Sequence, residues 1–70
     1  MKEYFKEIQR MLDDMEIEYF IKQEETDGDN KIIEIVVDDV YRRCLMPILR
    51  DKLKRVPKGL SIIFNFEVRR

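Results

Sequence analysis

The side chains of this sequence that could do chemistry are its charged ones, and they are sorted by position. Through Asp39 there are 13 acidic and five basic residues, a net of −8, whereas from Val40 onward nine basic residues stand against two acidic ones, a net of +7. Such asymmetry can mark a surface for nucleic acid, membrane or an oppositely charged protein, and it can equally belong to a domain whose acidic and basic elements face each other. The chemistry that it predicts is electrostatic binding.

The basic residues form a stripe if the segment 40–56 is helical. At about 100° per residue, Arg43, Arg50 and Lys54 fall within about 40° of one another. Further basic residues flank or extend the stripe at Arg42, Lys58, Arg69 and Arg70. Flexible cations on one surface can neutralise acidic side chains or phosphates. The stripe predicts contact with an acidic protein surface, a second copy of the chain or nucleic acid, and its alternative is a helix face that meets only water.

An acidic surface is predicted at a turn, with its carboxylates on Glu24, Glu25, Asp27 and Asp29. The spacing resembles the start of a calcium loop, but with Glu25 as its first ligand the glycine place holds Asn30 and the bidentate glutamate place holds Val36. We therefore predict a hairpin turn and no metal site.

Catalytic chemistry has no support in the sequence. The single cysteine, Cys44, has helical spacing that predicts burial, and the chain has no histidine to act as its base or to complete a zinc set. The acidic pairs fall at expected helix ends, where caps are the ordinary role. We predict no enzyme, no cofactor, no metal and no small-molecule substrate.

Length and composition predict one small domain over residues 1–70. The chain is 44% apolar, which is enough to fold, and no apolar run is long enough for a membrane span or a signal peptide. One cysteine and the absence of a membrane segment predict a cytoplasmic protein. A chain of this size buries a small core, which favours a homodimer.

The elements follow from hydrophobic periodicity. Helical spacing over residues 2–15 predicts a first helix, and alternation over 16–23 and 31–38 predicts two strands of a hairpin. Helical spacing over 40–56 predicts a second helix, with Val40 and Cys44 on its apolar side and a kink or split at Pro47. Residues 60–68 alternate as a last strand. The predicted class is α+β in the order α-β-β-α-β, with two helices on one face of a three-stranded sheet.

Cross-strand matching predicts the register of the hairpin. A three-residue loop over residues 27–29 pairs Ile21 with Ile35 and Lys22 with Glu34, whereas a two-residue loop at Asp27 and Gly28 pairs charged with aliphatic residues. We therefore predict the odd-length loop.

The sheet face that the helices leave open is not purely polar. It carries Phe20, Ile32, Val36 and Ile63 among polar residues. Scattered surface hydrophobic residues are normal, but in a domain this small they also indicate a self-association surface. We predict self-association through these four residues.

The order of elements resembles that of a type II K-homology domain, and equally that of a ferredoxin-like βαββαβ unit without its first strand. The resemblance to K-homology domains implies a Gly-x-x-Gly loop that grips nucleic acid, but residues 42–47 contain no glycine. It therefore implies a topology and no function.

These patterns together predict a small interaction or regulatory module with separate acidic and basic surfaces, whose partners are another protein or itself. The alternatives are a nucleic-acid-binding protein that uses the basic stripe and the carboxyl-terminal arginines, and an inhibitor whose acidic hairpin imitates a phosphate backbone.

Overall fold

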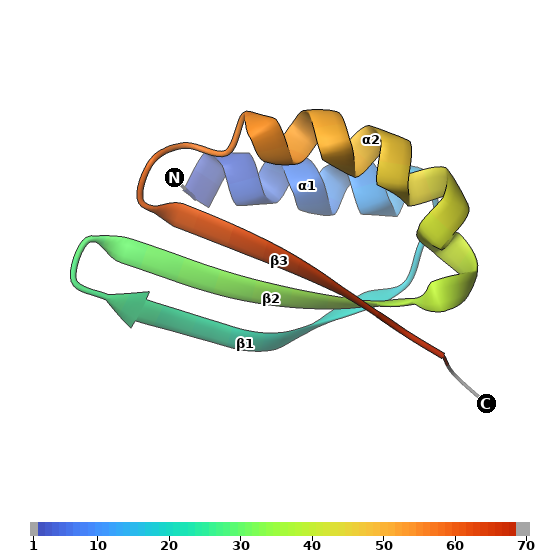
Figure 1. Cartoon of the computed structure of the whole chain (residues 1–70), viewed down its shortest axis with the longest axis horizontal. Helices are drawn as coiled ribbons and strands as arrows, with labels where there is room; N and C mark the ends of the chain where they lie inside the picture. The colour runs from blue at the N-terminus through green and yellow to red at the C-terminus, as the bar shows by residue number, and fades with distance from the viewer. Residues whose placement is uncertain (1, 69–70) are drawn as a thin grey trace.

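The computed structural model describes residues 2–68 and has an α+β fold, as predicted, with two helices and a three-stranded sheet (Figure 1). The chain runs through α1, β1, β2, a short 3-10 turn η1, α2 and β3. Both helices lie on the same side of the sheet, and the turn of the β1–β2 hairpin projects past them (Figure 1). Among residues 2–68 no helix has both the length and the apolar character needed to cross a membrane.

Helix α1, Lys2–Asp14, is amphipathic. Ile8 and Leu12 are fully buried in the core, while Lys6, Arg10 and the other exposed positions take up the opposite side. Burial of that apolar stripe, rather than intrinsic propensity, holds a helix of this length in place.

The end of α1 is closed by a left-handed residue. The Glu16 N–H donates to the Asp13 carbonyl at 3.0 Å, and the Ile17 N–H donates to the Leu12 carbonyl at 2.9 Å. This is the Schellman arrangement, and Glu16 has the left-handed φ of 57° that it requires. The residues at either end of the motif, Leu12 and Ile17, are apolar and are both buried in the core cluster.

The sheet has the order β1-β2-β3. Strand β1, Tyr19–Asp27, is antiparallel to β2, Asn30–Asp38, and β2 is parallel to β3, Leu60–Glu67. The central strand is the buried one, with Ile33, Ile35 and Val37 facing the helices. Strand β1 is exposed along nearly its whole length.

The register of the hairpin was predicted correctly at its base and wrongly at its loop. Ile21 pairs with Ile35 as predicted, but the turn has two residues, because Asp27 pairs with Asn30. Lys22 is the extra residue of a β-bulge that reconciles the two registers. Its ammonium nitrogen still reaches Glu34 Oε2, at 3.9 Å.

The segment after β2 starts with the turn η1, Asp39–Tyr41. Asp38 caps this turn, because its Oδ1 accepts a hydrogen bond from the Val40 N–H at 3.0 Å. Helix α2, Arg42–Lys54, then contains Pro47 and buries Leu45 and Leu49.

The predictions that Val40 and Cys44 face the core are wrong. Val40 is 74% exposed and Cys44 is exposed. Val40 belongs to the turn η1 and not to α2, whereas Cys44 lies within α2 but about 100° around the helix from Leu45 and about 140° from Leu49, outside the buried stripe. The Cys44 thiol donates instead to the Tyr41 carbonyl, with Sγ 3.3 Å from the oxygen.

The two helices are joined by Tyr4, whose hydroxyl donates to the carbonyl of Lys52 near the end of α2. Burial raises the pKa of the Tyr4 hydroxyl above its ordinary value, and the Glu7 carboxylate raises it further. The folded chain therefore holds this proton to a higher pH than the unfolded chain does. The stability that follows is present below about pH 10 and is lost as the pH rises beyond it.

Replacing Glu16 by Gly is expected to raise the free energy of unfolding by about 0.5–1 kcal/mol, because a left-handed φ strains every residue that has a Cβ. Urea denaturation checks this. The matched control is Asp14→Gly, at the last residue of α1, which should lower stability by about the same amount. A loss of stability in both variants would contradict the role given to Glu16.

Replacing Tyr4 by Phe is expected to lower the free energy of unfolding by about 0.5–1.5 kcal/mol, because the hydrogen bond to the Lys52 carbonyl is lost and that oxygen keeps, within residues 2–68, only the Arg55 N–H as its donor. The variant should also lose less stability than the wild type between about pH 9 and 11. Urea denaturation at several pH values measures both effects. Tyr19→Phe is the control, since the Tyr19 hydroxyl has no hydrogen bond within residues 2–68. Equal pH profiles for wild type and Tyr4→Phe would contradict the assignment.

Candidate functional site

The outer face of the sheet, opposite the helices, carries the four residues predicted for self-association. Phe20 and Ile63 are 45% and 49% exposed, Ile32 is half-buried, and Val36 is only 3% exposed. Val36 pairs with Phe20 across β1 and β2 and lines a small hollow with it. Val36 therefore supports Phe20 within the chain and offers little surface of its own.

A polar belt separates Phe20 from Ile63 on this face. Glu34 on β2 accepts a hydrogen bond from Asn65 Nδ2 at 3.2 Å and lies 3.9 Å from the Lys22 ammonium. Phe20 belongs to the edge strand β1 and Ile63 to the edge strand β3, with β2 between them. The structure therefore places the predicted residues on one face but does not join them into one apolar patch.

The basic residues of α2 divide into paired and unpaired ones. Arg42 Nε lies 3.0 Å from Asp39 Oδ1, and its guanidinium stands 5.4 Å from the centre of the Phe66 ring, so Arg42 is held within the chain. Arg43, Arg50 and Lys54 are exposed, and within residues 2–68 none of them has an ion-pair partner. These three residues are called the basic stripe from here on.

The remaining predicted basic residues do not extend this stripe in the described part of the chain. Lys58 lies at the turn before β3 and lines a hollow together with Gly28 and Asp29 of the hairpin turn. Arg69 and Arg70 lie outside the described residues.

The predicted acidic surface is exposed at the far end of the hairpin. Glu24, Glu25, Asp27 and Asp29 all have high exposure. Glu24 Oε1 is 3.0 Å from the ammonium of Lys31, which neutralises part of the cluster. Within residues 2–68 the carboxylates of Glu25, Asp27 and Asp29 form no ion pair, and they are concentrated toward the tip of the hairpin.

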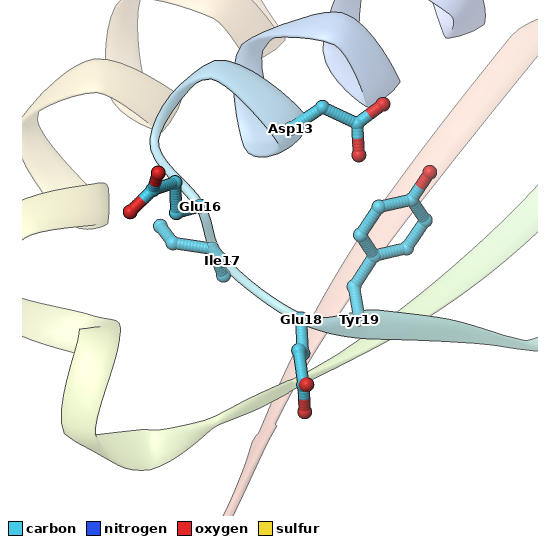
Figure 2. Close-up of a pocket in the computed structure, with 5 residues that line it drawn as sticks. All are labelled: Asp13, Glu16, Ile17, Glu18 and Tyr19. Carbon is cyan, nitrogen blue, oxygen red and sulfur yellow. The ribbon is translucent and has the colours of Figure 1, made fainter.

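A hollow that sequence reasoning missed lies where α1 passes into β1 (Figure 2). Figure 2 shows the carboxylate of Asp13 and the hydroxyl of Tyr19 pointing toward one another across it, while Glu16 and Glu18 point elsewhere. The signal that could have revealed it is the helix end itself, because the reversal at Glu16 brings Asp13 above the start of β1. Within residues 2–68 no three Asp, Glu, Cys or His side chains are grouped to hold a metal ion.

Comparison with known proteins gives no relative. The chain matches no protein-family model, no curated protein sequence and no solved structure.

Proposed function

We propose that this protein is a small non-enzymatic interaction module that binds an acidic surface of a partner protein through its basic stripe and also associates with itself. The observation that carries the proposal is the state of Arg43, Arg50 and Lys54, which are exposed and without ionic partners in the described chain. Four other basic side chains, by contrast, lie within ion-pair distance of a carboxylate: Lys22, Lys31, Arg42 and Arg55.

The short length of the basic stripe favours a protein over nucleic acid as the partner. At physiological ionic strength a charge acts over about 8 Å, so the stripe attracts what lies directly against α2. A helix of 13 residues is about 20 Å long. A long polyanion would reach past it to the acidic residues elsewhere on a molecule whose net charge is −1. A folded protein with a local acidic patch avoids that repulsion.

The shape of the stripe is part of the proposal. Pro47 lacks the N–H that would bond the Arg43 carbonyl one turn earlier, and its ring crowds that turn. We infer that α2 bends there, so that Arg43 is tilted relative to Arg50 and Lys54. The three cations would then follow a curved surface on the partner better than a straight one.

Reversing the charge of the stripe is expected to abolish partner binding. The variant Arg43→Glu with Arg50→Glu and Lys54→Glu should capture its partner from an extract of the producing cells at least about tenfold less well, because close interfacial charge pairs are each worth on the order of a kcal/mol or more. Capture by the wild type should also fall as salt is raised. Quantitative mass spectrometry of the captured proteins measures both.

The matched control is Lys6→Glu with Arg10→Glu and Lys22→Glu. This variant has the same net charge as the stripe variant, but its substitutions lie outside the basic stripe. Equal capture by the stripe variant and by this control would contradict the proposal. Loss of wild-type capture after nuclease treatment would assign the stripe to nucleic acid instead. Loss only when Glu25, Asp27 and Asp29 are changed to amides would favour the acidic hairpin as the binding surface.

A further inference from the structure

The two edges of the sheet are built differently. Edge strand β1 has a bulge at Lys22 and three carboxylates toward its end, at Glu24, Glu25 and Asp27. Bulges and charges are the devices by which natural sheets keep other strands from adding to an edge. Edge strand β1 is therefore protected against pairing.

Edge strand β3 has none of these devices over most of its length. Its sequence LSIIFNFE has no charged residue before Glu67 and no proline or glycine, and its register with β2 is unbroken. Within residues 2–68, β3 pairs with β2 alone, so its other side presents unpaired backbone groups. A long, regular and mostly apolar edge is a template for another strand.

The polarity of β3 is also symmetric about Ile63. Ser61 lies two residues before Ile63 and Asn65 lies two residues after it, and the other residues from Leu60 to Phe66 are apolar. An antiparallel pair of identical strands related by a two-fold axis matches each residue with the one equally far from the axis on the other side. A strand with this symmetry is complementary to a second copy of itself.

We propose that the protein forms a homodimer by antiparallel pairing of β3 with β3 of a second copy, with Ile63 next to the two-fold axis. This rests on the self-association in the proposed function and names its surface. The other pairs follow from the symmetry: Ser61 with Asn65, Ile62 with Phe64, and Leu60 with Phe66.

The register is selected by side-chain matching. With Ile63 at the axis, apolar residues pair with apolar residues. Asn65 Nδ2 already donates to Glu34, so the amide oxygen of Asn65 can accept a hydrogen bond from the Ser61 hydroxyl of the second copy. A shift that centres Phe64 instead would put Ile63 opposite Asn65 and Ser61 opposite Glu67. The first register is therefore preferred.

Charge complementarity supports the same register at both ends. Glu67 of one copy falls opposite Gly59 of the other, beside Lys58, and both charged side chains are exposed in the single chain. The two-fold axis repeats this pair at the other end of the interface. This register therefore brings an exposed carboxylate and an exposed ammonium toward the same end of the interface, where their opposite charges attract.

The dimer would double the binding surface. A two-fold axis perpendicular to the sheet joins the two three-stranded sheets into one of six strands and keeps all helices on the same face. Both basic stripes would then belong to one side of the assembly, and a partner with two acidic patches would bind with avidity.

Disulfide trapping tests the register. All variants carry Cys44→Ser, which removes the only native thiol. Directly opposed residues of antiparallel strands have Cα atoms roughly 4.5–5.5 Å apart, within disulfide range, whereas Ser61 would lie about 14 Å from its own symmetry mate. We expect a mixture of Ser61→Cys and Asn65→Cys chains to form covalent dimers at least about tenfold faster than either variant alone.

The control is Phe20→Cys, on the protected strand β1. It should cross-link no faster than Ser61→Cys alone or Asn65→Cys alone. Rapid cross-linking of Phe20→Cys without cross-linking of the Ser61→Cys and Asn65→Cys mixture would overturn edge pairing in favour of face-to-face packing, and would leave self-association standing. A wild-type chain that sediments as a monomer at every concentration would overturn both. Urea midpoints of the variants establish that each is folded.

Discussion

Two neighbouring parallel strands cannot be joined by a tight turn, so the parallel pairing of β2 with β3 requires the intervening chain to cross one face of the sheet. The crossing segment contains α2, and its Leu45 and Leu49 join the same core as Ile33, Ile35 and Ile62. α1 completes that layer. The other face has no element of the described chain above it, and β1 and β3 are left as edges.

This topology also explains why the charges that are separated in the sequence stay separated in space. The acidic hairpin extends beyond the helices, and its tip holds Asp27 and Asp29 (Figure 1). The basic stripe lies on the solvent side of α2, because the opposite side of that helix is buried. Near neutrality of the whole chain is thus the sum of two surfaces that a partner meets separately.

Periodicity was enough to predict the α+β class, both helices and the three strands, since burial of one face dictates the spacing of apolar residues. It failed where the local backbone departs from regular geometry. The turn η1 takes Val40 out of the helix, and the bulge at Lys22 allowed a two-residue loop with the predicted base register. Val36 is buried beside its cross-strand partner Phe20 on the face without helices, and the hollow beside Asp13 is also lined by the left-handed Glu16. Neither the burial of Val36 nor the hollow can be predicted from the alternation of residues in a single strand.

The asymmetry between a protected edge and an open one is the central claim of this account, and amide hydrogen exchange at increasing protein concentration tests it most directly. Between Leu60 and Phe66, the β3 amides that face the open edge should exchange more slowly as concentration rises, because the second copy pairs with them, while amides of β1 keep their rates. Exchange from β3 that does not depend on concentration, or slowing confined to β1, would contradict it.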